Sequence, residues 1–215
     1  MRAEIVKINS DSPETSLIKY AADQIRAGEV LGMPTDTFYG LAADPFNLRA
    51  VDKVYEIKTR SRHKPLSLLI GSVEQAEELA KPLPDEFYAL TRKFWPGPLT
   101  IIVKAGSRLP LKVTANTGNV ALRVPNASIP LAVVTAAAIP VTATSANLSG
   151  ASECTTAVQV RDQLQGRINI IVDGGTSPRS VPSTIIDLSG DGSGYRIIRE
   201  GAIPTDQITA FFAKG

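Results

Sequence analysis

The sequence predicts a single α/β domain that is built on a mixed sheet, with both parallel and antiparallel strands. Strand-like and helix-like segments alternate early in the chain, which is typical of α/β folds. Strand-like segments cluster late in the chain, which favours some antiparallel pairing. A length of 215 residues without a repeat, a low-complexity segment or a linker favours one domain over residues 1–215.

The N-terminal part predicts a strand, a helix and a second strand. The EIVKI run at 4–8 alternates between polar and apolar residues, as a half-buried strand does. Ser12 and Pro13 suit the N-cap and the first turn of a helix, and Gly28 suits its end. The EVLGM run at 29–33 is then a second, short strand.

The next part predicts an irregular segment followed by a helix, a strand and a helix. Residues 34–47 are too rich in Pro, Gly, Thr and Asp to form a simple element. Asn47 can cap a helix over about 48–58, which has Val and Tyr side chains along one face. The LSLLI run at 66–70 is a candidate for a buried strand, and Ser72 begins the next helix with a capping box.

Two helices and two strands are predicted in the middle of the chain. Pro84 starts a helix that ends near Trp95. The PGPLTIIVKA segment at 96–105 is a turn and a strand, and the NVALRV run at 119–124 is a further strand. A helix follows at about 129–138.

The C-terminal part predicts mainly strands. The IPVTATSANLSG segment at 139–150 is a strand that runs into a polar loop, and a helix lies near 156–165. Three further strands and a last helix complete the chain, at 168–172, 183–188, 195–200 and about 205–213.

Composition excludes several classes of protein. One cysteine, Cys154, and one histidine, His63, can form neither a disulfide framework nor a zinc site built from Cys and His. The net charge of +2 is lower than that of a general nucleic-acid binder. No apolar run approaches the roughly 20 residues of a membrane span, and the first residues lack the apolar stretch of a signal peptide. We therefore expect a cytoplasmic protein with no membrane association.

Four cations are concentrated in seven residues, at Lys58, Arg60, Arg62 and Lys64. An extended chain would point all four to one side, and a helix would place Lys58 and Arg62 on one face. Either geometry gives a cationic surface at the entrance to the strand at 66–70. One interpretation is a solvated basic loop. The other is a clamp for a phosphate chain, in which Arg binds bidentately and Lys acts as a point charge.

Further polar residues are candidates for ligand binding, although the standard phosphate-binding loops are missing. Ser145 and Asn147 follow an apolar strand and could donate to phosphate or ribose oxygens, but an ordinary polar turn explains this segment better when it is taken alone. Arg123 interrupts an apolar strand, and an inward-facing arginine needs an anionic partner. That partner could be a buried carboxylate or the carboxylate of a substrate. Ser183 begins a later strand, and Arg199 lies near the end of another.

Seven segments, taken together and in order, resemble the YrdC/Sua5 family of threonylcarbamoyl-AMP synthases. They are PTDTFYGLAAD, IKTR with KPLSLLI, FWPGPLTIIV, VALRVP, TSANLSG, PSTIID and REGAI. The family's Lys-x-Arg and Ser-x-Asn signatures correspond to Lys58-Thr59-Arg60 and Ser145-Ala146-Asn147. The resemblance covers about residues 10–205, and we expect the single-domain form of the family. Ser61 and Thr144 stand where the family often has proline, which leaves the fine geometry of the two loops open.

The resemblance implies a fold and a reaction. The fold is a twisted open sheet of mixed direction around a large, positively charged cavity. The reaction is that of a nucleotidyltransferase, which forms threonylcarbamoyl-AMP and pyrophosphate from L-threonine, bicarbonate and ATP. The product would serve the N6-threonylcarbamoyladenosine (t6A) modification at position 37 of tRNA, with other proteins making the transfer. Mg²⁺ would be carried by ATP, without direct protein ligands, and no organic cofactor is implied.

The resemblance also implies the roles of particular residues. Catalysis would depend on Lys58 and Arg60. The residues implied for ATP are Lys58, Arg62, Asn119, Ser145, Asn147, Ser152 and Arg199. Those implied for threonine are Thr35, Ser67, Arg123, Ala143 (through its backbone) and Ser183. Two alternatives stay open: an RNA-binding module, with weak RNA binding by the cationic cavity, and a paralogue that acts on another carbamate or lacks the synthase activity.

Overall fold

The strands form two mixed sheets in the computed structural model, which describes residues 3–178, 180–190 and 194–213. The first sheet has the order β1 (Glu4–Lys7), β9 (Ile170–Asp173), β2 (Leu31–Met33), β3 (Gly40–Ala42) and β8 (Thr144–Ser145). The second has the order β11 (Arg196–Arg199), β10 (Thr184–Asp187), β5 (Leu99–Lys104), β6 (Asn119–Arg123), β4 (Ser67–Leu69) and β7 (Val141–Thr142). Both sheets contain parallel and antiparallel pairs, so the predicted α/β fold of mixed strand direction is confirmed.

The two sheets meet at residues 141–145, where the chain crosses from one to the other. β7 pairs with β4 of the second sheet, and β8 pairs with β3 of the first. At this crossing, the Thr142 N–H at the end of β7 donates to the Ala43 carbonyl (2.9 Å), and the Ala143 N–H between the two strands donates to the Ser67 carbonyl (N···O 2.8 Å). This crossing brings strand ends from both sheets around one space.

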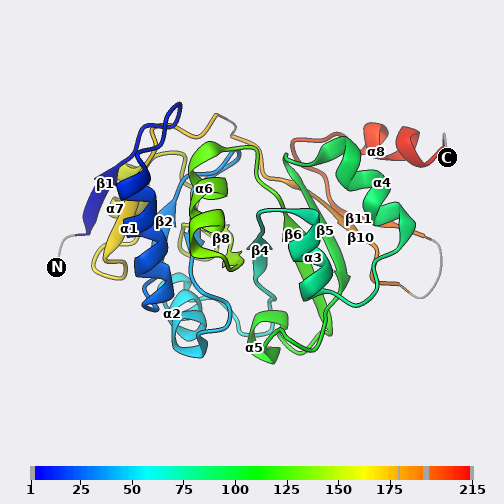
Figure 1. Cartoon of the computed structure of the whole chain (residues 1–215), viewed down its shortest axis with the longest axis horizontal. Coiled ribbons are helices and arrows are strands. Elements are labelled where there is room, and N and C mark those ends of the chain that lie inside the picture. Colours follow the sequence, from blue (N-terminus) through cyan, green and yellow to red (C-terminus); the bar gives the residue numbers. More distant parts are fainter. Residues whose placement is uncertain (1–2, 179, 191–193, 214–215) are drawn as a thin grey trace.

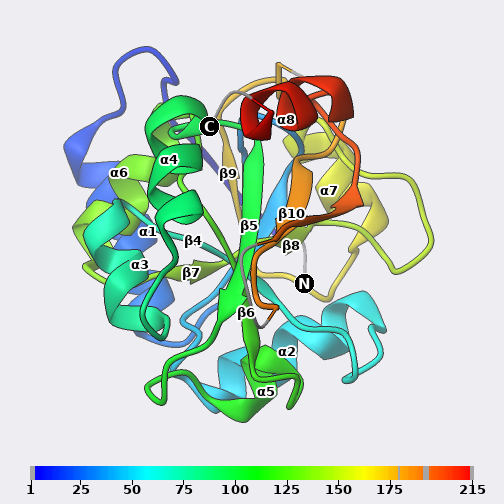
Figure 2. The ribbon, with the colours of Figure 1, turned by 90° about the vertical axis from the view of Figure 1, so that its right-hand side faces the viewer.

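Eight helices of the described chain cover the sheets (Figures 1 and 2). Helices α1 (Thr15–Arg26) and α6 (Ser128–Ala137) lie side by side over the first sheet, and α3 (Val73–Leu79) and α4 (Asp85–Phe94) lie over the second. The other four are α2 (Leu48–Lys58), α5 (Leu111–Thr114), α7 (Ala157–Gln163) and α8 (Thr205–Phe212). None of the described helices is long and apolar enough to cross a membrane.

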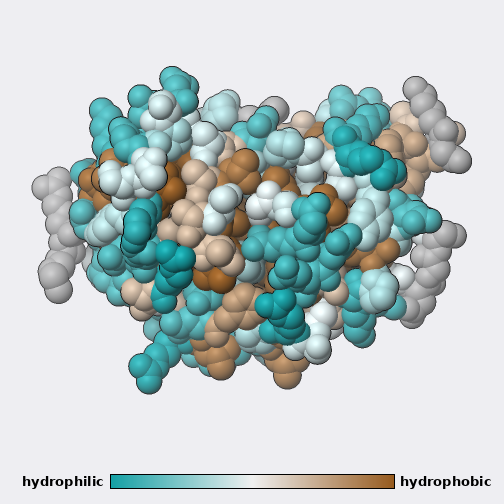
Figure 3. Space-filling view, viewed as in Figure 1, coloured by the Kyte–Doolittle hydropathy of each residue, from teal (hydrophilic) through white to brown (hydrophobic). Residues whose placement is uncertain are grey.

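Two apolar cores hold these layers together. In the first, Ile18 and Ile25 of α1 pack with Val172 of β9. In the second, Phe87 of α4 packs with Leu122 of β6. The face seen in Figure 3 is hydrophilic over most of its area, with apolar surface along α6. The sheets are therefore supported by helices, while the strand ends stay available for a site.

Asn47 and Ser72 cap α2 and α3 as predicted. The Asn47 side chain accepts two backbone N–H groups of the first turn of α2. Ser72 Oγ accepts the Gln75 N–H at 3.4 Å. The Gln75 side chain accepts the N–H of Gly71 rather than that of Ser72, so the capping box is only half formed. The cap on α2 positions the residues that follow this helix at the site.

Helix α1 starts later than the sequence predicts. Ser12 and Pro13 were suited to its first turn, but the helix begins at Thr15. Asn9 Oδ1 accepts the N–H groups of Asp11 (2.9 Å) and Ser12 (3.3 Å). This local turn is an alternative to helix, and it delays the helix start.

Candidate functional site

A cavity of about 200 Å³ lies at the junction of the two sheets. The wall on the side of the first sheet consists of Thr35, Thr37, Phe38, Tyr39, Gly40, Thr144 and Ser145. The wall on the side of the second sheet consists of Ser67, Leu68, Leu69, Thr100, Arg123, Ile185 and Arg199. Arg60, Ala143, Glu153, Pro182 and Ser183 complete the lining. Three of these residues are arginines and one is a glutamate, so cations outnumber carboxylates on the wall.

The connection between β2 and β3 is a tight turn that brings hydroxyl groups to the cavity. The Thr35 hydroxyl donates to the Phe38 carbonyl (2.7 Å), and it accepts the Thr37 N–H (3.1 Å). The Tyr39 hydroxyl donates to the Gly175 carbonyl (2.6 Å), which ties the turn to the segment after β9. Because the turn is bonded at both ends, Thr35 and Thr37 have fixed positions on the wall.

Arg123 lies at the end of β6, and Asp36 is its anionic partner. Nη2 of Arg123 donates to Asp36 Oδ1 (2.5 Å), Nη1 to Thr37 Oγ1 (3.1 Å), and Nε to the Gly97 carbonyl (3.0 Å). The side chains of the ion pair are only 8% and 6% exposed. Of the two partners that the sequence left open, the structure contains the buried carboxylate. Arg123 also lines the cavity, so its contact with a substrate carboxylate stays a prediction.

Lys58, the last residue of α2, is buried and joins the two signature segments. Only 2% of the residue is exposed. Its ammonium group donates to the carbonyls of Ser145 and Asn147 and to Asn147 Oδ1 (2.7 Å). Ser145 Oγ also donates to Asn147 Oδ1 (2.7 Å). Burial, with a smaller contribution from Arg60, lowers the pKa of Lys58 to about 8. Lys58 thus fixes the loop after β8 from behind the cavity wall.

The cationic run from 58 to 64 does not point to one side, contrary to both predicted geometries. Thr59 has a left-handed conformation (φ 49°), and the chain turns at once instead of continuing as a helix or a strand. Arg60 lines the cavity and donates to the Pro65 carbonyl (3.0 Å). Arg62 points away and forms an ion pair with Asp52, with 54% of its side chain exposed. Only the first half of the run therefore belongs to the site.

The hairpin of β10 and β11 brings Ser183 and Arg199 to the cavity. The Arg199 guanidinium donates to the Ser183 carbonyl from Nε (3.1 Å) and Nη2 (2.8 Å). The Ser183 hydroxyl lies 2.8 Å from the Thr100 hydroxyl on β5. Arg199 is thus oriented by the segment that also carries Ser183.

The structure brings most of the residues implied by the resemblance to this one place. The cavity is lined by Thr35, Ser67, Arg123, Ala143 and Ser183 of the threonine set, and by Arg60, Ser145 and Arg199. Lys58 and Asn147 lie directly behind this wall.

Three residues of the ATP set lie neither on the cavity wall nor directly behind it, namely Arg62, Asn119 and Ser152. Asn119 begins β6, the strand that Arg123 ends, so the two residues lie at opposite ends of it. The Ser152 carbonyl accepts from Gln163 Nε2 (3.0 Å). Their contacts with ATP stay predictions.

Sequence reasoning gave no role to three residues of this site: Asp36, Thr100 and Glu153. The one acidic residue in the PTDTFYG segment was a signal for Asp36, but its partner lies 87 residues away in the sequence. Glu153 follows the polar loop directly and carried no local signal.

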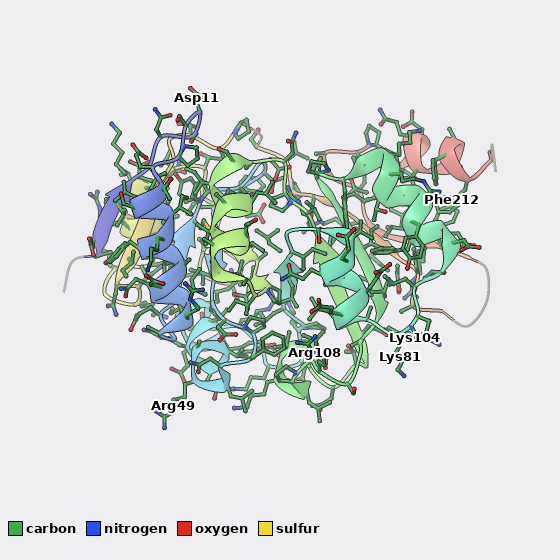
Figure 4. The ribbon with its side chains drawn as sticks, viewed as in Figure 1. Asp11, Arg49, Lys81, Lys104, Arg108 and Phe212 are labelled. Carbon is green, nitrogen blue, oxygen red and sulfur yellow. The ribbon has the colours of Figure 1, made fainter. Side chains whose placement is uncertain are left out.

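Two basic side chains far from the cavity, those of Arg49 and Lys81, point to solvent. Arg49 on α2 and Lys81 after α3 extend outward from the lower rim of the molecule (Figure 4). Within the described part of the chain, no three His, Cys, Asp or Glu side chains are grouped so that they could hold a metal ion.

Comparisons with known proteins identify the family of the chain. The Sua5/YciO/YrdC family model, which carries the description "Telomere recombination", matches residues 23–201. The chain is 38% identical over 191 residues to the threonylcarbamoyl-AMP synthase of Pyrococcus abyssi, covering 89% of this chain and 56% of that protein. It is also 38% identical over 205 residues to the threonylcarbamoyl-AMP synthase of Bacillus subtilis, covering 95% of this chain and 58% of that protein.

A solved structure of a member of the same family has the same fold. The crystal structure of P. abyssi Sua5 complexed with L-threonine superimposes with a TM-score of 0.92 and 35% sequence identity. The superposition covers 97% of this chain and 61% of that chain. The chain therefore spans little more than half of the length of these relatives.

Proposed function

The chain belongs to the Sua5/YciO/YrdC family, and on this premise we propose that it forms threonylcarbamoyl-AMP and pyrophosphate from L-threonine, bicarbonate and ATP. One observation carries the proposal. The Lys-x-Arg and Ser-x-Asn signatures, 89 residues apart at Lys58 and Asn147, are hydrogen-bonded to each other (2.7 Å) beside a cavity that both sheets line. The relatives from P. abyssi and B. subtilis are named for this activity.

L-threonine is assigned to the part of the cavity between the β2–β3 turn and the second sheet. All five residues of the threonine set line the cavity: Thr35, Ser67, Arg123, Ala143 and Ser183. Arg123 supplies a cation for the carboxylate of the amino acid while Asp36 holds it in place. The hydroxyl groups of Thr35, Ser67 and Ser183 suit a small hydroxy amino acid.

ATP is assigned to the side of the cavity that carries Arg60, Ser145 and Arg199. Two arginines from different elements face the same space there, as a triphosphate site requires. Lys58 contributes through the loop that it holds, because its ammonium group is already occupied by protein acceptors. Arg62, Asn119 and Ser152 contact ATP only where the nucleotide extends beyond the cavity.

The reaction needs positioning and cationic stabilisation more than a protein nucleophile. The neutral amine of threonine reacts with bicarbonate to give a carbamate. A carbamate oxygen then attacks the α-phosphorus of ATP, and pyrophosphate leaves. Negative charge develops on the phosphate oxygens, where fixed arginines lower the barrier. Mg²⁺ enters as the ion bound to the ATP phosphates.

The product is proposed to serve t6A formation at position 37 of tRNA in the cytoplasm, through other proteins that use it. Threonylcarbamoyl-AMP is a mixed anhydride with an activated carbonyl group, so its carbamoyl group can be passed to an amine. This proposal requires no RNA binding by the chain itself.

Pyrophosphate release tests the proposal directly. Purified protein is incubated with ATP, Mg²⁺ and bicarbonate, and with threonine, serine or no amino acid. We expect release that requires both threonine and bicarbonate. Release that is absent under every condition, from protein shown to be folded, favours an RNA-binding module or an inactive paralogue. Release with another amino acid favours a related carbamate enzyme.

A further inference from the structure

The described lining of the cavity contains one carboxylate, that of Glu153, and the reaction proposed above assigns no role to it. It is partly buried and lines the cavity together with Arg60, Arg123 and Arg199. Among the residues that the structure describes, no group forms a hydrogen bond or an ion pair with this carboxylate. A carboxylate that shares a cavity wall with three arginines, and forms no ion pair with a described residue, is available to a ligand.

Two electrostatic interactions locate Glu153 at the boundary between the threonine and ATP sides. Its charge partly offsets the lowering of the pKa of Lys58 by burial, and Lys58 holds Asn147 on the ATP side. Its charge also partly offsets the lowering of the pKa of Arg199 by burial, and Arg199 donates to the carbonyl of Ser183, a residue of the threonine set. Lys58 comes from α2 and Arg199 from β11, and Glu153 interacts electrostatically with both groups.

The proposed reaction places the nitrogen of the amino acid at this same boundary. The amine becomes the carbamate whose oxygen attacks ATP, so it must lie between the two substrates. Free threonine carries an ammonium group at neutral pH, and this group must lose a proton before it can react. The arginines of the wall repel an ammonium group, whereas Glu153 attracts it. No other described residue of the cavity lining is acidic.

We propose that Glu153 binds the ammonium group of the substrate amino acid and accepts a proton from it; this inference rests on the proposed function. One N–H bond breaks, the proton goes to the Glu153 carboxylate, and the electron pair stays on nitrogen. The neutral amine then attacks the carbon of bicarbonate. The new N–C bond forms as a C–O bond breaks, and the hydroxide leaves as water with a second proton from nitrogen. Glu153 returns its own proton to solvent.

Calorimetry on Glu153→Gln tests the binding part of the proposal. This change keeps the size of the side chain and removes its charge and basicity. We expect the Kd for threonine to rise at least about tenfold, as for a broken charge pair. The Kd for 3-hydroxybutanoate, which lacks the amine, should stay within about twofold. Glu78→Gln, a change in an exposed ion pair with Arg108, should alter neither value.

Kinetics on the same variants test the proton transfer. For Glu153→Gln we expect a lower kcat/KM for threonine at pH 7, partial recovery at higher pH as threonine loses its own proton, and an unchanged KM for ATP. The charged or titratable groups that line the cavity with Glu153 are Tyr39, Arg60, Arg123 and Arg199, and Lys58 and Cys154 interact with it electrostatically. They are present in both proteins, but the change also removes the contribution of Glu153 to the pKa of Lys58. The recovery of kcat/KM at the pH at which threonine loses its own proton therefore reports the proton transfer, and a shift near pH 8 does not.

Three outcomes overturn the proposal. Equal losses of affinity for threonine and 3-hydroxybutanoate assign Glu153 a general structural role. A raised KM for ATP or a raised Mg²⁺ requirement assigns it to the nucleotide. Full activity of Glu153→Gln leaves it without a role while the synthase activity stands. If wild-type protein binds threonine but releases no pyrophosphate, the proposed function fails, and the calorimetric comparison still decides whether Glu153 binds the ammonium group.

Discussion

Lys58 is a charged side chain with almost no exposure to solvent, and it is tolerated because each proton of its ammonium group has an acceptor. The acceptors are the carbonyls of Ser145 and Asn147 and the side-chain oxygen of Asn147. Hydrogen bonds from a charged donor are about twice as strong as neutral ones. Lys58 therefore acts on the cavity through the loop that presents Ser145, and we regard it as a positioning residue.

Replacement of Lys58 by alanine is expected to disable the site without unfolding the protein. The change leaves Ser145 and Asn147 without their shared donor, so the loop loses its fixed position. We expect kcat/KM for pyrophosphate release to fall at least about a hundredfold. Lys53→Ala, on the same helix but paired with Glu29 near the surface, is the matched control and should keep its activity. Unchanged release by a folded Lys58→Ala variant contradicts the prediction.

The lowered pKa of Lys58 also predicts a pH-dependent stability. The pKa falls from its ordinary value of 10.5 to about 8 in the folded protein, mainly through burial. Between these values the unfolded chain holds a proton that the folded protein has lost, so the free energy of unfolding rises with pH. Relative to Lys58→Met, the wild type should gain up to about 3 kcal/mol over this window. Urea unfolding at several pH values measures the difference, and a constant difference argues against the prediction.

The buried pair of Arg123 and Asp36 predicts a large loss of stability when one partner is removed. Asp36→Ala leaves a charged guanidinium group inside the protein without its carboxylate. Loss of one partner of a buried pair costs about 3–5 kcal/mol. Glu78→Ala, which breaks an exposed pair with Arg108, should change the free energy of unfolding little. Similar urea midpoints for the two variants would show that the buried pair is not needed for folding.

At the scale of elements, the sequence predicts the helices and strands that have a regular spacing of apolar residues or a capping residue. The predicted helix at 48–58 matches α2, because Asn47 supplies the cap and the apolar face is continuous. β3 and α5 were not predicted. They have only three and four residues, respectively, which is too short for a regular spacing of apolar residues to be visible. β3 forms because the turn held by Thr35 returns the chain alongside β2. Such short elements depend on partners that local sequence does not contain.

The candidate site could be predicted as a set of residues but not as an arrangement. The order of the motifs predicted Arg60 and Ser145 as site residues, and both line the cavity. The direction of each cation was not predictable, because Arg62 turns to Asp52, ten residues earlier on α2. The pairing of Arg123 with Asp36 joins residues 87 positions apart. These contacts come from tertiary packing, which local periodicity does not report.

The β10–β11 hairpin predicts a strict need for glycine at position 201. A Cβ at Gly201 would lie 2.3 Å from the Pro182 carbonyl oxygen and 2.6 Å from the Ser183 carbonyl carbon. These are backbone atoms, so Gly201→Ala must move the segment that carries Ser183 and Arg199. We expect a loss of about 1–3 kcal/mol in stability and a raised KM for threonine. Gly190→Ala, which meets nothing within 4 Å, is the control for thermal unfolding and kinetics. Equal behaviour of the two variants contradicts the prediction.

At the scale of the whole molecule, the site depends on two sheets that meet along one short crossing. The crossing at 141–145 carries Ala143 and Ser145, and both line the cavity. The threonine set takes residues from both walls, and so does the ATP set. A net charge of only +2 leaves the cavity arginines as a local feature and not part of a generally basic surface. The two substrates would therefore bridge the sheets rather than bind to either one.

This bridging predicts that the two substrates stabilise the protein cooperatively. A ligand at about 100 times its Kd stabilises the folded state by about 2.7 kcal/mol, and each kcal/mol raises Tm by about 2–4 °C for a protein of this size. Threonine and a non-hydrolysable ATP analogue should together raise Tm by more than the sum of their separate shifts, because the first ligand already holds both walls in place for the second. Differential scanning calorimetry measures the three shifts. Ser183→Ala should reduce the threonine shift and the cooperative part while keeping the shift with the ATP analogue. Strictly additive shifts in the wild type would mean that each substrate contacts a wall that is already rigid, and that the crossing alone fixes the two sheets.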